Sequence, residues 1–290
     1  MRGLSDNTRG ALLMMSAMGF FTVNDSFLKG IGTGVNVWQV LFLRGIGISL
    51  VLMTIMYLRG VRFSVLSRRD WLLSIGRALT EAAAALLFVS ALQRMPFANV
   101  SAILQALPLT VTLAGFLFLR EPVGWRRGAA IGIGLAGMLL IVRPGAEGFN
   151  AWSLLAVGAV VCVTARDIFA RMLSPAAPSL AVAGISAMGV TAVTAMGLPF
   201  VGTDPMTATQ GWLLLGAVVA VSVGYITSVS AMRVGDLGFV APFRYFSLLV
   251  AVVLGLVFFA EVPDVLMLAG GAIIVVSGLY TLVRERRLAL

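Results

Sequence analysis

Apolar runs of helical spanning length dominate this sequence. A transmembrane helix needs about 20 mostly apolar residues, and 60% of this chain is hydrophobic against 11% charged. The runs are continuous, unlike the short alternating segments of a membrane barrel, and a helix satisfies its own backbone hydrogen bonds in lipid. We therefore expect ten transmembrane helices, at about 10–31, 36–58, 71–93, 97–119, 125–143, 151–172, 179–200, 211–232, 238–260 and 265–283. The first run is too long for a cleaved signal peptide, so we expect it to remain as the first helix.

The residue types exclude several classes of protein. The chain has no histidine and one cysteine, Cys162, so a disulfide within the chain is impossible and a zinc site or a catalytic Cys/His or Ser/His pair is not expected. No Walker A loop is present, so the chain does not itself hydrolyse ATP. We expect no cofactor and no metal. The net charge of +9 does not indicate a nucleic-acid partner, because the basic residues sit mostly at helix ends.

The distribution of arginine predicts the orientation in the membrane. Cytoplasmic loops are enriched in Lys and Arg. One set of connections carries Arg94 and Arg143. The opposite set carries Arg2, Arg9, Arg59, Arg62, Arg68, Arg69, Arg120, Arg126, Arg127, Arg171, Arg233, Arg284, Arg286 and Arg287. We therefore expect both termini at the cytoplasmic face.

Two polar segments near the ends of apolar runs share a pattern. Residues 22–29 (TVNDSFLK) and 164–171 (TARDIFAR) keep Thr, Asp, Phe and a basic residue at the same spacing, 142 positions apart. Ser90 matches Ser230, and Glu121 matches Glu261, both 140 positions apart. This nearly constant offset predicts two repeats, residues 1–143 and 144–290. Each repeat holds five helices, and because five is odd, the second enters the membrane from the opposite side.

An inverted repeat is typical of secondary transporters, whose substrate site lies near midplane and is exposed alternately to each side. The predicted fold is an all-α integral membrane protein with ten transmembrane helices, arranged as two inverted five-helix repeats around a central cavity. A membrane-embedded enzyme and a channel are the alternatives from other classes. A channel would be favoured by a filter-like loop, and the sequence contains none.

The sequence also resembles a known family over essentially its whole length. Residues 90–100 (SALQRMPFANV), Pro108, residues 118–121 (FLRE) and the Gly-rich stretch that follows resemble the end of a repeat of EamA-type exporters, in the drug/metabolite transporter superfamily. The second half departs from this pattern, with Leu248 at the position of Pro108 and Val-Pro after Glu261. The resemblance implies a ten-helix inverted-repeat fold, a cavity lined by helices 1, 3, 4, 6, 8 and 9, and export of amino acids or other small amphipathic metabolites.

Charged side chains at membrane depth are candidates for function. Asp25 and Lys29, Arg77 and Glu81, and Asp167 and Arg171 are each four apart, so each pair shares a helix face. If all three pairs form, Arg44, Arg166 and Arg244 lack a partner on their own helix. Such an Arg suits a substrate carboxylate and Glu81, near midplane, suits an ammonium group, so we predict a zwitterionic substrate. The alternative is that these charges only pair within the fold or snorkel to an interface.

The predicted roles are as follows. The residues assigned to the substrate cavity are Arg44, Arg77, Glu81, Gln105, Tyr225, Arg244 and Tyr245. Those assigned to a gate or to coupling are Asn24, Asp25, Lys29, Arg166 and Asp167. Pro108 is expected to kink or hinge its helix. Gly124, Gly128, Gly132 and Ala136 form a smooth stripe that predicts close helix packing in a scaffold, or a dimer face.

We therefore predict a secondary transporter, not an enzyme, that exports amino acids or related small amphipathic metabolites across a bacterial-type inner membrane. Its expected partners are a small-molecule substrate and membrane lipid, with the protein a monomer or weak homodimer. An exporter of cationic drugs with the same fold is the alternative within the class. It would fit an apolar cavity with an exposed acidic residue, whereas a cavity with charges of both signs favours an amino acid.

Overall fold

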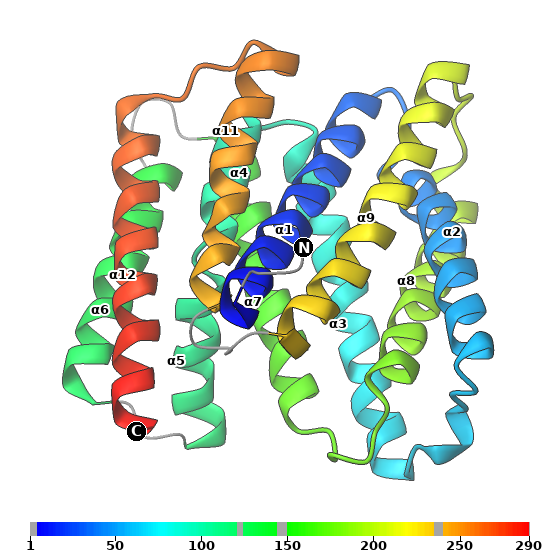
Figure 1. The fold of residues 1–290 in the computed structure, drawn as a ribbon. Coiled ribbons are helices and arrows are strands. Elements are labelled where there is room, and N and C mark those ends of the chain that lie inside the picture. Colours follow the sequence, from blue (N-terminus) through cyan, green and yellow to red (C-terminus); the bar gives the residue numbers. More distant parts are fainter. Residues whose placement is uncertain (1–4, 121–123, 144–149, 235–239, 290) are drawn as a thin grey trace. The chain divides into compact units, whose positions relative to one another are not determined.

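A computed structural model describes residues 5–120, 124–143, 150–234 and 240–289. Helices and short turns fill these ranges, and none of them contains a strand (Figure 1). The helices are α1 (Asp6–Ile31), α2 (Val37–Leu58), η1 (Phe63–Val65), α3 (Arg68–Leu92), α4 (Phe97–Leu104), α5 (Leu107–Leu119), α6 (Trp125–Val142), α7 (Trp152–Arg171), α8 (Ser179–Val201), α9 (Ala208–Val234), η2 (Ala241–Tyr245), α11 (Phe246–Phe259) and α12 (Val265–Ala289).

These helices account for the predicted apolar runs. Within the described ranges, eight helical stretches are long and apolar enough to cross a membrane. Two shorter apolar stretches, Gly128–Val142 and Val265–Thr281, complete the ten. The predicted all-helical membrane fold is therefore confirmed. The inverted relation between the two sequence halves stays a prediction.

The predicted fourth helix is interrupted rather than continuous. It divides into α4 and α5, with Gln105 and Ala106 in a turn between them. Pro108 lies in the first turn of α5, where its missing N–H removes no helical hydrogen bond. The predicted ninth helix divides in a similar way into η2 and α11, and here Pro242 lies in the first turn of η2. Both interruptions thus have a proline nearby, at different positions.

Both of these divided helices end in the same conformation. Arg120 follows α5 with a φ of 56°, and Ala260 follows α11 with a φ of 51°. The N–H of each donates to a carbonyl five residues earlier, Gly115 and Gly255 respectively. A left-handed residue at this point satisfies a carbonyl that the helix end would leave unpaired. The two ends are 140 positions apart, which is the register of the predicted repeat.

One compact unit comprises residues 1–26, 95–154 and 219–290. Its main packed pairs are α6 with α12 and α4 with α11. Gly134 lies opposite Ser277, and Gly137 lies opposite Gly270 and Ile273, so α6 and α12 run antiparallel. A Cβ built at Gly137 would lie 3.0 Å from the carbonyl oxygen of Gly270, so only glycine permits this approach.

The predicted glycine stripe on α6 does not make this contact. No described atom of another element lies within 4 Å of a Cβ built at Gly124, Gly128 or Gly132. The expectation that this stripe packs closely within the scaffold is wrong, because Gly134 and Gly137, two and five residues beyond Gly132, face α12 instead. The spacing of four identified a smooth helix face but not the direction in which that face points.

The other compact unit comprises residues 27–94 and 155–218. Here α8 packs against both α2 and α3. Met56, Ala78, Ala181 and Ile185 belong to one buried apolar cluster in this unit. Gly45 of α2 faces Thr191 of α8, and Gly197 of α8 faces the Trp38 ring. Each unit takes helices from both sequence halves, so the units are not the predicted repeats.

Candidate functional site

Four charged side chains from α3 and α7 meet within the second unit. Arg77 Nη1 lies 3.3 Å from Glu81 Oε2, one helical turn further along α3. Arg166 Nη1 of α7 lies 3.2 Å from Glu81 Oε1. Arg166 Nη2 also lies 2.8 Å from Asp167 Oδ1. We call Arg77, Glu81, Arg166 and Asp167 the charged cluster; with two groups of each sign, its formal charge is zero.

The charged cluster lies well inside the membrane-spanning helices. Glu81 is 13 residues after Arg68 in a helix of 25 residues, or about 20 Å along it. The side chains of Arg77 and Glu81 are 18% and 19% exposed, and that of Arg166 is 24% exposed. An isolated charge at this depth is costly. Pairing of opposite charges lowers that cost and explains why the four groups lie together.

One atom of Glu81 keeps unused hydrogen-bonding capacity. Oε2 is buried and within ion-pair distance of Arg77, yet it accepts no hydrogen bond from any described residue. The Arg77 guanidinium instead donates from Nη1 to the hydroxyl of Ser186 on α8. A carboxylate oxygen can accept more than one hydrogen bond. The Oε2 atom is therefore able to accept a donor that enters the site.

Local packing brings α3 and α7 close enough for these contacts. Ser67 caps the start of α3 by accepting from the Asp70 N–H. The Asp70 carboxylate in turn accepts from the N–H and the hydroxyl of Ser174, both at 2.9 Å, in the turn after α7. Further along α3, a Cβ built at Gly76 would lie 3.0 Å from the Phe169 ring of α7. Glycine at this point lets α7 approach α3.

The structure thus joins residues to which the sequence assigned different roles. Arg77 and Glu81 were expected to bind substrate, and Arg166 and Asp167 to form a gate or to couple. The predicted pair of Arg77 with Glu81 is present. Arg166, expected to lack a partner on its own helix if the spacing pairs formed, contacts Asp167 on that helix and Glu81 on α3. Ser186 was missed, because a single serine in an apolar helix gives no signal in the sequence.

The predicted residues of the first polar motif, and Arg44, are not members of the charged cluster. Asn24 Nδ2 donates to Asp25 Oδ1 at 2.8 Å. Lys29 Nζ donates to the carbonyl of Leu92, at the end of α3, at 3.3 Å. Arg44 is half-buried on α2. Their predicted roles stay predictions.

In the first unit, the predicted polar residues gather around the two helix interruptions. Gln105 Nε2 donates to the Ser247 hydroxyl at 2.7 Å, and that hydroxyl donates to the Arg244 carbonyl at 3.0 Å. The Tyr245 side chain is buried, and a Cβ built at Gly278 of α12 would overlap its hydroxyl. Arg244 is exposed.

Tyr225 packs in the same unit, with its ring edge-on to Phe21 at a centroid separation of 5.5 Å. Ser247 was missed as a partner of Gln105, because the offset of 140 in this part of the sequence matches Gln105 with Tyr245 instead.

The charged cluster has the groups to recognise ions of both signs. Among the described residues, no group of three His, Cys, Asp or Glu side chains is placed to hold a metal ion. Guanidinium groups bind carboxylates through paired hydrogen bonds, and carboxylates accept from ammonium groups. The cluster therefore offers complementary groups for both ends of a zwitterion.

The helices and their buried charges define a multi-pass α-helical membrane protein. Residues 8–143 match the EamA-like transporter family. The match covers just under half of the chain, and it confirms the resemblance to EamA-type proteins of the drug/metabolite transporter superfamily.

Several characterised proteins are similar to this chain. A riboflavin transporter of Vibrio cholerae is 33% identical over 180 residues, which are 61% of this chain and 59% of that protein. An S-adenosylmethionine uptake transporter of Rickettsia bellii is 26% identical over 66% of each chain. The pseudopaline exporter CntI of Pseudomonas aeruginosa is 26% identical over 73% of this chain and 75% of its own. The chain spans less than two thirds of the first two relatives.

The fold also has a counterpart among solved structures. A crystal structure of a protein that is 20% identical covers 97% of this chain and 99% of its own, with a TM-score of 0.65. At this level of identity, the likeness concerns the fold alone. It extends over both halves of the chain, whereas the family match covers the first.

Proposed function

We propose that this protein is a secondary transporter that exports amino acids or related small zwitterionic metabolites across a bacterial cytoplasmic membrane by alternating access. The observation that carries the proposal is the charged cluster, with its buried, unsatisfied Glu81 Oε2 atom. Intramembrane charges that face one another are typical of substrate and ion pathways.

The mechanism follows from exchange of partners within the cluster. A substrate carboxylate competes with Glu81 and Asp167 for the guanidinium groups of Arg77 and Arg166. A substrate ammonium group takes the acceptor positions that are released, beginning with Glu81 Oε2. Because the cluster and a zwitterion are both neutral overall, binding leaves no net charge buried. A substrate with only one charged group would leave one member of the cluster unpaired.

Alternating access rests on the predicted inverted repeat, and one hydrogen bond supports that repeat. The Ser49 hydroxyl lies 3.3 Å from the Thr191 hydroxyl. These two residues are 142 positions apart, the offset of the two polar motifs. Contacts between equivalent residues are expected where two repeats meet at a symmetry axis.

The relatives support transport of small metabolites and leave its direction to experiment. Their names specify riboflavin, S-adenosylmethionine and pseudopaline, and they include one uptake transporter and one exporter. We propose export because of the resemblance to EamA-type exporters. The amino-acid class is proposed because the charged cluster contains both signs of charge.

The test is counterflow in liposomes that contain the purified protein. Liposomes preloaded with one unlabelled amino acid are diluted into the same labelled compound, with neutral, basic, acidic and aromatic amino acids tested in turn. The same assay includes riboflavin, S-adenosylmethionine and a cationic dye. We expect saturable accumulation of at least one amino acid, and its loss in Glu81→Gln. Assays with and without a pH gradient then decide whether protons are coupled.

The matched control is Arg59→Ala, which removes an exposed charge at the end of α2, away from the charged cluster. This variant should transport as the native protein does. Accumulation of the dye or of riboflavin without any amino acid would overturn the substrate class while leaving a transporter. Accumulation of no compound by a protein that remains folded would count against the function itself.

A further inference from the structure

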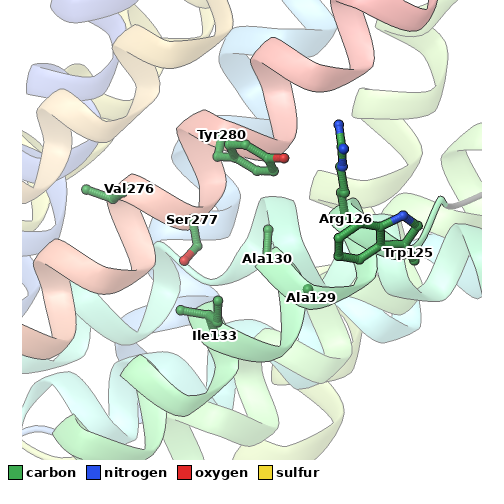
Figure 2. A pocket seen from close by; sticks show the side chains of 8 residues that line it. All are labelled: Trp125, Arg126, Ala129, Ala130, Ile133, Val276, Ser277 and Tyr280. Carbon is green, nitrogen blue, oxygen red and sulfur yellow. The ribbon is translucent and has the colours of Figure 1, made fainter.

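A groove lies between α6 and α12, outside the charged cluster and in the other unit. Its volume is about 420 Å³. Figure 2 shows the side chains along it, among them Trp125, Arg126, Ala129 and Ile133 of α6 and Val276 and Tyr280 of α12. The small side chains of Ala129 and Ala130 on α6 and Ser277 on α12 also line it. The two helices therefore leave a space that neither fills.

The lining of this groove changes in character from one end to the other. Trp125, Arg126 and Tyr280 lie at one end, and Ile133 and Val276 lie toward the other (Figure 2). The Arg126 guanidinium carbon lies 5.3 Å from the centre of the Trp125 ring, a cation–π arrangement. Trp and Tyr favour the level of the lipid headgroups. An occupant with a polar head and an apolar tail matches this order.

A positive charge lies at the aromatic end of the groove, where Arg126 is part of the lining. Because α6 and α12 are antiparallel, the start of α6 lies beside the end of α12. At the other end of the helix pair, Arg143 is ion-paired with Asp264. The Arg126 guanidinium thus favours an anionic head at the aromatic end.

We infer that this groove binds an anionic phospholipid. The phosphate group contacts Arg126 beside Trp125 and Tyr280, and an acyl chain lies over Ala129, Ile133 and Val276. Basic pockets between transmembrane helices bind anionic headgroups by this combination of charge and apolar surface. In the predicted second repeat, the residues 140 positions after Trp125 and Arg126 are Val265 and Leu266. They supply neither an aromatic ring nor a charge. The site is therefore specific to one membrane face.

Native mass spectrometry of the full-length protein in detergent tests this inference. The protein is mixed with equal amounts of phosphatidylglycerol and phosphatidylcholine, and retained lipids are counted. We expect phosphatidylglycerol to be retained preferentially. Arg126→Ala should weaken its retention about fivefold, which corresponds to about 1 kcal/mol for one basic residue near a lipid surface. Ala129→Trp fills the groove and should abolish retention.

The control is Arg59→Ala, which removes an exposed charge outside the groove and should retain lipid as the native protein does. Arg126 and Ala129 are both exposed, so their replacement spares the core. Size-exclusion chromatography first checks that each variant elutes as a single species. If Arg126→Ala or Ala129→Trp does not, Ile133→Ser is used in its place. Equal retention of the two lipids, or undiminished phosphatidylglycerol in the groove variants, overturns the inference. A dimer that Ala129→Trp dissociates, with lipid unchanged, identifies a second copy as the occupant instead.

Discussion

Among single residues, Glu81 differs from the other charges because it contacts two guanidinium groups at once. Arg77 approaches one of its carboxylate oxygens and Arg166 approaches the other. Loss of this one carboxylate leaves two cations, Arg77 on α3 and Arg166 on α7, with Asp167 as the one remaining anion of the charged cluster. Loss of Arg166 leaves Arg77 with Glu81 and removes the Arg166 contact of Asp167. The two changes are therefore not equivalent.

A double-mutant cycle measures this difference. We expect Glu81→Gln to lower thermal stability more than Arg166→Gln does, since the cations it leaves unbalanced, Arg77 and Arg166, are 18% and 24% exposed, whereas Asp167, which Arg166→Gln leaves unbalanced, is 34% exposed. The double variant should be more stable than the sum of the two single effects predicts, by a coupling energy of about 0.5–3 kcal/mol. Thermal unfolding in detergent gives all four values. Additive effects would show that the contact between Glu81 and Arg166 contributes nothing to stability.

The carboxylate of Asp264, in the connection before α12, should make the stability of the fold depend on pH. The Met267 N–H, which donates to this carboxylate, holds its pKa below the ordinary value, with a smaller contribution from Arg143, although partial burial opposes the shift. A carboxyl whose pKa is lower in the folded state stabilises the fold above its unfolded pKa, near 3.9. This stabilisation is lost as the pH falls through the folded pKa.

The measurement compares melting temperatures of the native protein and Asp264→Asn between pH 7 and pH 3. The native protein should be the more stable at pH 7, and the difference should shrink below about pH 4. A difference that stays constant to pH 3 would mean that the charge of Asp264 does not matter. Arg59→Ala is the control, because its effect on the melting temperature should not change with pH.

Among the helices, α6 offers a matched pair of glycine substitutions. Gly137→Ala should lower stability by about 1–3 kcal/mol, because the added methyl group meets backbone of α12 that cannot move aside. Gly128→Ala, on the same helix, meets no neighbour and should be neutral or slightly stabilising. Thermal unfolding of the two variants checks this. Equal losses would mean that helix propensity, not packing, decides the effect.

The helices also show where sequence reasoning succeeds. Apolar runs predicted the spanning helices well, since length and hydropathy suffice for that. They did not predict the turn at Gln105 and Ala106, because Pro108 marked a disturbance nearby but not its position. In the site, spacing identified Arg77 with Glu81. The contact of Arg166 with Glu81 depends on how α7 packs on α3, which no local pattern records.

For the whole molecule, the predicted orientation can be tested with two exposed loop positions. Ser64 precedes α3 and Thr203 follows α8, on opposite predicted faces. In a Cys162→Ala background, Thr203→Cys should react with a membrane-impermeant maleimide in intact cells, and Ser64→Cys only after permeabilisation. The reverse pattern would place the termini outside. Labelling of both residues in intact cells would contradict the prediction that they lie on opposite sides of the membrane.

The composition of the two compact units has a consequence for biosynthesis. Residues 27–94 and 155–218 complete one unit, so it can assemble once α8 and the first part of α9 have left the ribosome. The other unit needs α12, which is synthesised after all the other described helices and is the packing partner of α6. During translation, α6 must therefore wait in the bilayer while more than a hundred residues follow it.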